Sequence, residues 1–304
     1  MLISQLETVN VADGRPRRSA GPGSGEEAGM RIGFVGAGRM GRPMVERLVG
    51  AGHEVRVLGR SAGARTALEA AGARAVAGAA DAAEGADAVI VCVFDDGQVR
   101  DVCLRGDLLA RMPEGSVAVL HTTGSPGTAR AVAERAAPGG VGVVDCPVSG
   151  GPHDIAAGRL TLFAGGAAGD VAKARPALRA YGDPVVHAGP LGAGQSVKLV
   201  NNALFAAQIG LIAEAVRLGG RLGLDEAALL GALPHASSAS RALAGVAGRG
   251  SVAAFARAVS GFLAKDVDVV RSVAAELGGD LGALDGAIGA LDAVLDGVLE
   301  TGGP

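Results

Sequence analysis

A glycine triplet near the start of the chain constrains its fold more than any other feature. Gly36, Gly38 and Gly41 follow directly on the apolar run 31–35 and open the helical pattern 42–49. In a strand–turn–helix unit the first glycine makes the tight turn, the second admits a pyrophosphate and the third lets helix and strand pack closely. A glycine-rich turn in a glycine-rich chain is the alternative, but the strand and helix on either side favour a dinucleotide site. We assign that site to Gly36, Ala37, Gly38, Arg39, Met40 and Gly41.

Short apolar runs alternate with Ala-rich helical stretches from residue 30 to about residue 187. Strands with little polar alternation, separated by helices, are typical of a parallel sheet covered on both faces. After Gly194 the strand pattern ends and Ala/Leu-rich helical segments follow. The predicted fold is α/β, with an N-terminal doubly wound Rossmann-type parallel sheet over 30–192 and an all-helical C-terminal domain over 193–304. The predicted strands are 31–35, 54–58, 88–93, 117–120 and 142–145.

The composition argues against several classes of partner. With a formal net charge of −3 and 2% aromatic residues, the chain offers neither a basic surface nor stacking side chains to a nucleic acid. No apolar run approaches bilayer length, so we expect no membrane contact. Cys92, Cys103 and Cys146 form no CxxC or Cys/His pattern, so we expect no disulfide framework and no metal.

The first 29 residues mix acidic and basic side chains and end in a Gly/Ser/Pro stretch. A secretory signal needs an apolar run before its cleavage site, and this segment has none. We predict that residues 1–29 are a disordered extension and that the protein is cytoplasmic.

The end of the second predicted strand bears on the choice of cofactor. An NAD site usually places Asp or Glu there to bind the ribose 2′-hydroxyl, whereas this strand is followed by Gly59, Arg60 and Ser61. Arg60 can pair with a 2′-phosphate, assisted by the Ser61 hydroxyl. We therefore expect NADP rather than NAD, with a solvated loop arginine as the alternative.

Lys198 and Asn202 lie four residues apart, so on a helix their side chains share one face. A lysine in apolar surroundings has a depressed pKa, which suits a general acid/base near neutral pH. By itself, a helical lysine is more often a surface residue with its amine in water. The stretch from 196 to about 222 is apolar nearly all round, which predicts a buried helix and, through it, a homodimer.

Four ordered motifs resemble the β-hydroxyacid dehydrogenase family, which includes 3-hydroxyisobutyrate dehydrogenases, tartronate semialdehyde reductases and glyoxylate/succinic semialdehyde reductases. The motifs are the glycine fingerprint, Asp145–Gly151 followed by Gly158–Thr161, the segment Gly192–Asn202, and Phe262–Val267. The resemblance covers residues 30 to about 277. Residues after Gly278 depart from the family, so the resemblance leaves the substrate open.

The resemblance implies roles for the two lysine motifs. Lys198 would be the proton donor or acceptor, and Asn202 would position the substrate. Lys265 would lie near the nicotinamide end of the cofactor. The alternative is a helix-surface lysine that pairs with Asp266 or Asp268.

Ser149, with the amides of Gly150 and Gly151, would hold the substrate carboxylate, because a hydroxyl beside two unobstructed N–H groups binds anions. A glycine turn after a strand is the alternative. Thr123 stands where the family carries a Ser-Thr pair and would contact nicotinamide or substrate, or else cap a turn. Phe94 lies in a loop where the family usually has Leu-Pro-Asp, and we expect backbone contact with the cofactor there.

His121 precedes the threonine pair at a position where the family tends to have an apolar residue. At the carboxyl end of a strand it would lie near the ligand crevice, although a structural histidine is the more frequent outcome.

The leading hypothesis is an NADP-dependent oxidoreductase that interconverts a small 3-hydroxy acid and its semialdehyde or oxo acid. One alternative is imine reductase-like activity, although imine reductases generally lack the lysine. Another is a cofactor-binding sensor or scaffold without turnover. The 6-phosphogluconate dehydrogenases share the motifs but have a much larger helical domain.

Overall fold

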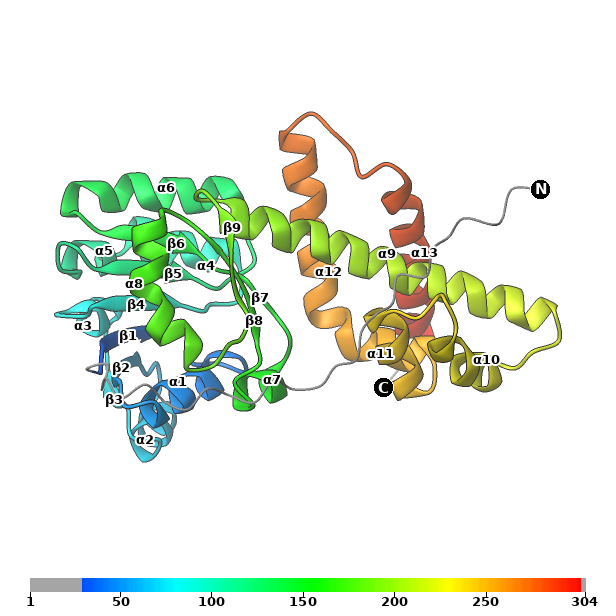
Figure 1. Ribbon diagram of the computed structural model, residues 1–304, viewed down its shortest axis with the longest axis horizontal. Helices are drawn as coiled ribbons and strands as arrows, with labels where there is room; N and C mark the ends of the chain where they lie inside the picture. The colour runs from blue at the N-terminus through cyan, green and yellow to red at the C-terminus, as the bar shows by residue number, and fades with distance from the viewer. Residues whose placement is uncertain (1–28, 302–304) are drawn as a thin grey trace, which may run out of the picture.

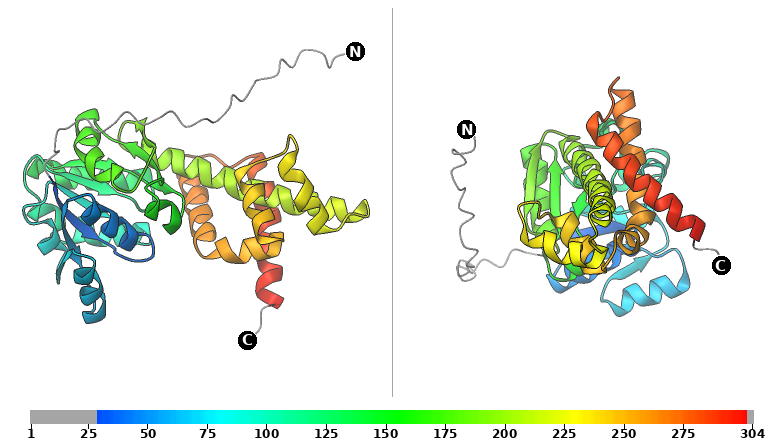
Figure 2. Two further views of the ribbon diagram at one scale, coloured as in Figure 1. Left: turned by 60° about the horizontal axis from the view of Figure 1, so that its bottom comes forward. Right: turned by 90° about the vertical axis from the view of Figure 1, so that its right-hand side faces the viewer.

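The computed structural model describes residues 29–301, with side chains described up to residue 296. Apart from Gly29, the predicted disordered extension lies outside the described residues. Within them, the chain forms a sheet-containing half that ends with β9 (Val185–Gly189) and a helical half that begins with α9 (Ala193–Arg221) (Figure 1). Two further views show α9 leaving the sheet-containing half and running through the helical half (Figure 2).

A single sheet forms the centre of the first half. Its strands follow the order β3-β2-β1-β4-β5-β6-β8-β7, and β9 pairs with β8. The run from β3 to β6 is parallel, and the order reverses between β1 and β4, which creates a crevice at the carboxyl ends of the strands. The strands are β1 (Arg31–Val35), β2 (Glu54–Leu58), β3 (Arg74–Val76), β4 (Ala88–Val91), β5 (Val117–Leu120), β6 (Gly142–Asp145), β7 (Val148–Ser149), β8 (Thr161–Gly165) and β9.

The doubly wound fold is confirmed, and the five predicted strands are present, with β4 shorter than predicted. The sheet is not purely parallel, because β8 runs antiparallel to both β6 and β7. Four strands were not predicted. Three residues suffice for β3 and two for β7, and so short a segment shows no apolar period of its own.

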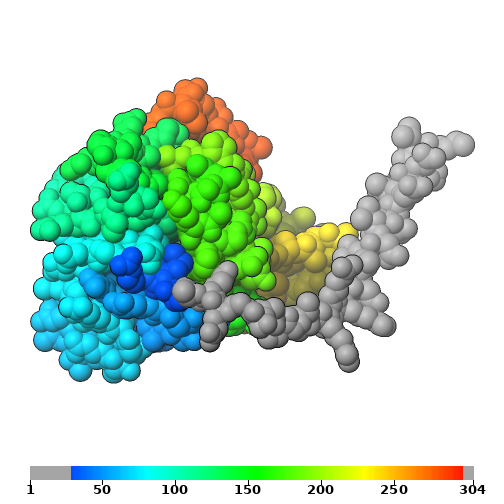
Figure 3. Space-filling view, turned by 60° about the vertical axis from the view of Figure 1, so that its left-hand side comes forward, coloured from blue at the N-terminus to red at the C-terminus, as the bar shows by residue number. Residues whose placement is uncertain are grey.

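Helices cover both faces of the sheet and build separate cores. One core lies under α1 and α8 and includes Phe34 and Met44, while the other lies under α6 and includes Leu108 and Val132. Figure 3 views this half from its outer side, with the helical half behind it. The helices here are α1 (Gly41–Gly50), α2 (Ala62–Ala70), α3 (Ala79–Ala83), α4 (Asp96–Arg100), α5 (Leu108–Arg111), α6 (Pro126–Ala136), α7 (Pro152–Ala156) and α8 (Ala168–Arg179), with a π-helical turn at Asp101–Arg105 and a 3-10 turn at Ala137–Gly139.

The helical half is built around α9. Its other elements are α10 (Glu226–Ala232), a 3-10 turn (Leu233–His235), α11 (Arg241–Arg249), α12 (Val252–Glu276) and α13 (Ala283–Thr301). Helices α9 and α13 cross in close contact, where a Cβ at Gly210 would overlap the carbonyl oxygen of Ala287. Glycine is therefore needed at 210 for these two helices to cross so closely.

The α9 helix is only partly buried, contrary to the prediction of a helix buried all round. Val200, Leu204, Leu211 and Leu218 are 66%, 48%, 58% and 56% exposed and follow a helical spacing along one side. By length and composition alone, α9 is also long and apolar enough to cross a membrane, contrary to the expectation that no apolar run in this chain approaches bilayer length. Its other side packs against α12 and α13, as expected of a core helix.

Candidate active site

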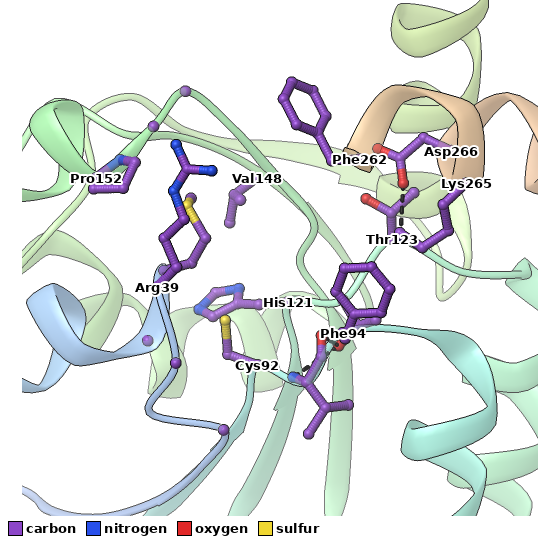
Figure 4. Close-up of a pocket in the computed structure, with 18 of the residues that line it drawn as sticks. Arg39, Cys92, Phe94, His121, Thr123, Val148, Pro152, Phe262, Lys265 and Asp266 are labelled. Atoms are coloured by element: carbon purple, nitrogen blue, oxygen red, sulfur yellow. Dashed lines mark hydrogen bonds and ion pairs between the residues drawn. The ribbon is translucent and has the colours of Figure 1, made fainter. Parts of the chain in front are cut away.

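A cleft of about 1530 Å³ lies at the carboxyl ends of β1, β4 and β5 and extends to α9, α11 and α12. Both halves of the chain line it. Figure 4 shows Arg39 and Pro152 on one side, Phe262 and Lys265 on the other, and His121 between them. All the residues predicted for the cofactor and substrate sites line this one cleft: Gly36, Ala37, Gly38, Arg39, Met40, Gly41, Arg60, Ser61, Phe94, Thr123, Ser149, Gly150, Gly151, Lys198, Asn202 and Lys265.

The three fingerprint glycines meet different surroundings. Gly36 has φ +103°, and a Cβ there would overlap the carbonyl oxygen of Cys92. A Cβ at Gly41 would overlap the carbonyl oxygen of Gly36 and lie 2.8 Å from Phe34 Cε1. A Cβ at Gly38 would meet no atom within 4 Å. Two of the glycines are therefore required by the fold itself, whereas Gly38 faces the open cleft.

The start of α1 suits an anion. No side chain caps this helix, and no acidic residue occupies its first turn. The Arg42 N–H donates to the Gly38 carbonyl at 2.9 Å and Pro43 has no N–H, which leaves the Gly41 N–H of the first turn for a phosphate, and the helix dipole favours negative charge there. Together with the open space at Gly38, these features fit the pyrophosphate of a dinucleotide.

Arg60 and Ser61 lie in the cleft between β2 and the start of α2. Arg60 is exposed, and no carboxylate among the described residues pairs with it. The Ser61 Oγ accepts a hydrogen bond of 3.2 Å from the Ala64 N–H and so caps α2. Its hydroxyl hydrogen remains free to donate.

Lys198 lies on α9, half-buried where the helix faces the cleft. Burial lowers the pKa of its amine. The Asp266 carboxylate opposes that shift and the Lys265 ammonium adds to it. An amine whose pKa falls from its ordinary value exchanges protons more readily near neutral pH.

Asp266 on α12 connects the polar residues of the helical half, and it is 6% exposed. Its Oδ2 accepts a hydrogen bond of 2.7 Å from Asn202 Nδ2, and Lys265 Nζ lies 2.7 Å from its Oδ1. The contact with Lys265 is close enough for an ion pair, but its geometry is not that of a hydrogen bond. Asp266 Oδ1 therefore lacks a hydrogen-bond donor among the described residues. Lys265 Nζ also lies 5.4 Å from the centre of the Phe94 ring, which brings α12 to the loop after β4. Lys265 thus pairs with Asp266, as the alternative interpretation had it, and still lines the cleft.

The Ser149–Gly151 segment lies at the other side of the substrate end. Ser149 is half-buried at the end of β7, and Gly150 has φ +130°. The Gly151 N–H donates to Asp154 Oδ2 at 2.8 Å as part of the start of α7. One of the two amides predicted to hold a carboxylate therefore already has a partner in this structure.

The threonine pair divides its tasks. The Thr122 hydroxyl donates to the Val93 carbonyl at 2.9 Å and accepts from the Val93 N–H at 3.1 Å, which holds the loops after β4 and β5 together. Thr123 is half-buried and lines the cleft.

His121 is 3% exposed and has partners on both ring nitrogens. Its Nδ1 lies 2.6 Å from the Cys146 carbonyl and its Nε2 lies 2.7 Å from Tyr181 Oη. Burial lowers the pKa of this histidine to about 4, so the ring is neutral at pH 7. It is a hydrogen-bonded structural histidine at the base of the cleft.

Asp145 and Gln195 lie inside quoted motifs but were given no role from the sequence, and Asp266 was considered only as a partner of Lys265. The hydrogen-bond partners of these three side chains are 47, 71 and 64 residues away in the chain. No spacing rule within one element could have paired them.

Comparison with known proteins agrees with this geometry. A family model described as the NAD binding domain of 6-phosphogluconate dehydrogenase matches residues 31–189. A second, described as NAD-binding of NADP-dependent 3-hydroxyisobutyrate dehydrogenase, matches residues 192–299.

Two curated proteins of Pseudomonas aeruginosa are similar to this chain, an NAD-dependent L-serine dehydrogenase and a 3-hydroxyisobutyrate dehydrogenase. Each is 39% identical over 214 residues, which are 70% of this chain and 72% of the relative. Among solved structures, Mycobacterium tuberculosis 3-hydroxyisobutyrate dehydrogenase with L-serine is 29% identical. It superimposes with a TM-score of 0.79 over 90% of this chain and 94% of its own.

Proposed function

The chain belongs to the β-hydroxyacid dehydrogenase family of NAD(P)-dependent enzymes, and from this we propose that it is an NADP-dependent oxidoreductase with a lysine general acid/base. Its substrate would be a small 3-hydroxy acid, interconverted with its semialdehyde or oxo acid. The observation that carries the proposal is Lys198, an amine of lowered pKa held beside Asn202 and Asp266 in the cleft.

Lys198 is assigned the proton transfer. When the acid is oxidised, the neutral amine takes the proton of the substrate hydroxyl, and in reduction the ammonium returns it to the carbonyl oxygen. A bound nicotinamide supplies or accepts the hydride. The Asp266 carboxylate stabilises the ammonium form of Lys198. The lysine can therefore keep the proton that it takes in oxidation and donate it in reduction.

Asn202 and Ser149 are assigned the orientation of the substrate. One N–H of the Asn202 amide is committed to Asp266, which leaves the second free to donate to a bound oxygen. Across the cleft, the Ser149 hydroxyl and the Gly150 N–H would hold the carboxylate, with Thr123 beside the reacting end. Fixing the acid at one end presents its hydroxyl carbon in a single orientation.

The preference for NADP rests on Arg60 and Ser61. A guanidinium and a serine hydroxyl at the start of α2 are donors for a 2′-phosphate, and β2 ends without a carboxylate for a 2′-hydroxyl. Calorimetric titration with NADP and with NAD measures this preference directly.

Turnover is tested by following nicotinamide absorbance with short 3-hydroxy acids, semialdehydes and cyclic imines. We expect an acid to be turned over by the wild type and not by Lys198→Ala. The control is Lys173→Ala, since Lys173 is an exposed lysine of α8 whose Nζ donates to the Gly115 carbonyl away from the cleft. Equal rates for wild type and a folded Lys198→Ala variant would defeat the proposal, and turnover of imines alone would replace the substrate class.

In this proposal the helical half completes the substrate site and forms the contact between two copies of the chain. The exposed apolar side of α9 would pair with that of a second copy, which would remove Val200, Leu204, Leu211 and Leu218 from water. Light scattering should give the mass of two chains for the wild type and of one chain for Leu211→Glu. Leu277→Glu is the control, because this side chain is 82% exposed beyond the end of α12. Localisation in the cytoplasm stays a prediction.

A further inference from the structure

The start of α9 is held by a carboxylate from a distant strand. Asp145 ends β6 and is fully buried. Its Oδ1 accepts a hydrogen bond of 2.6 Å from the Gly192 N–H, and its Oδ2 accepts one of 2.7 Å from the Gln195 N–H. Gly192, at the N-cap position, has φ +93° and no side chain with which to cap the helix. Asp145 therefore supplies the helix cap from outside the helix.

The surroundings of this carboxylate are closely fitted. A Cβ at Gly194 would lie 2.9 Å from Asp145 Oδ2 and would overlap the carbonyl oxygen of Phe163. A Cβ at Gly165 would overlap Asp145 Oδ1 and lie 2.7 Å from the Gly194 nitrogen. Both glycines are needed for β8 and α9 to close around the carboxylate, so the position of α9 is set by this contact.

Gln195 extends the same contact to the loop after β5. Its side chain is 3% exposed. Its Oε1 accepts from the Gly124 N–H at 3.0 Å, and its Nε2 donates to the Thr122 carbonyl at 2.8 Å. These two bonds flank Thr123 and fix the backbone on either side of it.

Lys198 lies three residues after Gln195, about one helical turn further along α9. The same turn of helix is thus fixed to β6 through Asp145 and to the Thr122–Gly124 loop through Gln195. Because Thr123 and Lys198 line the cleft from opposite halves of the chain, the four hydrogen bonds determine how far apart they lie.

We propose that Asp145 and Gln195 are positioning residues that set the Lys198 amine against the nicotinamide end of the cleft without touching substrate or cofactor. The proposal rests on the proposed function, since it concerns the rate of the reaction assigned to Lys198. Misplacing a reacting group by about 1 Å costs about 100-fold in rate, so loss of these bonds should lower kcat more than it changes binding.

The variants are chosen to remove different bonds. Gln195→Met removes both side-chain bonds while keeping the length of the side chain. Gln195→Glu keeps an acceptor for Gly124 but sets a carboxylate oxygen against the Thr122 carbonyl. Asp145→Asn turns one acceptor towards an N–H into an opposed donor. Asp225→Asn is the matched control, because Asp225 caps α10 through the Ala228 N–H at 2.7 Å and lies outside the cleft.

Kinetics are measured well below each variant's unfolding temperature, with the deuterium isotope effect on kcat for cofactor labelled at the transferred hydride. We expect kcat to fall by about 10- to 100-fold in the Gln195 and Asp145 variants, with a larger isotope effect and cofactor affinity within about threefold of wild type. The Asp225 control should match wild type. Unchanged kcat in folded Gln195→Met, or a loss of kcat shared by the control, would overturn the proposal.

Amide hydrogen exchange separates this proposal from the proposed function. If the wild type turns over no acid, the proposed function is refuted, and the positioning role of Asp145 and Gln195 is then tested by amide exchange alone. The amides of Gly124, Gly192 and Gln195 should exchange at least tenfold faster in the variants that remove their acceptors. Unchanged exchange rates at these three amides would refute the positioning role of Asp145 and Gln195, whatever the activity of the variants.

Discussion

Gly38 lies in the turn after β1 and Gly41 begins α1 three residues later, and the structure predicts opposite effects of replacing each with alanine. At Gly41 the new methyl group would overlap the Gly36 carbonyl oxygen and crowd Phe34 Cε1 at 2.8 Å. At Gly38 it would meet no protein atom within 4 Å, and the backbone there is not left-handed. The first substitution should damage the fold, and the second should damage only binding.

The magnitudes follow from these contacts. Overpacking a close contact costs about 1–3 kcal/mol, which in a chain of this size lowers Tm by about 2–5 °C for Gly41→Ala. Gly38→Ala removes freedom from the unfolded chain and should leave Tm unchanged or raise it slightly. Its methyl group stands between the loop and a pyrophosphate. Losing one charge-assisted hydrogen bond of about 1.5–3 kcal/mol weakens cofactor affinity by about 10- to 100-fold.

The assays are thermal unfolding without cofactor and calorimetric titration with NADP. Gly63→Ala is the control for composition, because Gly63 is a helical glycine of α2 whose added Cβ also meets nothing within 4 Å. If Gly38→Ala bound NADP as tightly as wild type, the pyrophosphate would not lie over this loop. If Gly41→Ala unfolded at the wild-type temperature, the close contact of α1 with β1 would not limit the side chain that the fold tolerates at this position.

Three further predictions concern single side chains. Arg60→Ala should weaken NADP binding by about 10- to 100-fold, the loss of about 1.5–3 kcal/mol, and leave NAD binding unchanged in the same titration. Asp266→Asn removes the charge that raises the pKa of Lys198, so the pH profile of kcat/KM for oxidation should move to lower pH; a shift to higher pH would contradict the assignment. The folded-state pKa of His121, about 4, lies below its unfolded value, so its stabilising contribution is complete above about pH 6.5 and is lost as pH falls towards 4. Urea unfolding should show wild type losing about 3 kcal/mol more than His121→Gln between pH 7 and pH 4, and parallel losses would refute the assignment.

The outline of the fold followed from local patterns. Near-continuous apolar runs between helical stretches indicated the parallel strands β1, β2, β4, β5 and β6. The glycine fingerprint predicted a dinucleotide site in the turn after β1. Strands β3, β7, β8 and β9 were missed. Their pairing, part of it antiparallel, depends on partners brought together by the fold, and their residues show no period that separates a strand from a loop.

The candidate site likewise has features that the sequence could predict and features that it could not. Lys198 and Asn202 could be placed on one face because four residues make about one helical turn. The sequence could not supply Asp266 as the partner of Asn202, nor could it show that the Gly151 amide would be taken by Asp154. It also predicted that α9 would be buried all round, whereas one side of it is exposed.

By itself, the sequence determined those features that depend on the geometry of one strand, one turn or one helix: the glycine loop, the shared face of Lys198 and Asn202, and the order of the sheet-forming segments. The tertiary structure decided which distant groups meet, namely Asp145 with the start of α9 and Asp266 with Asn202. It also decided how deeply Lys198 lies and therefore the direction of its pKa shift. The physical reason is that spacing within an element is set by backbone geometry, whereas desolvation and contacts between elements exist only once the elements have packed.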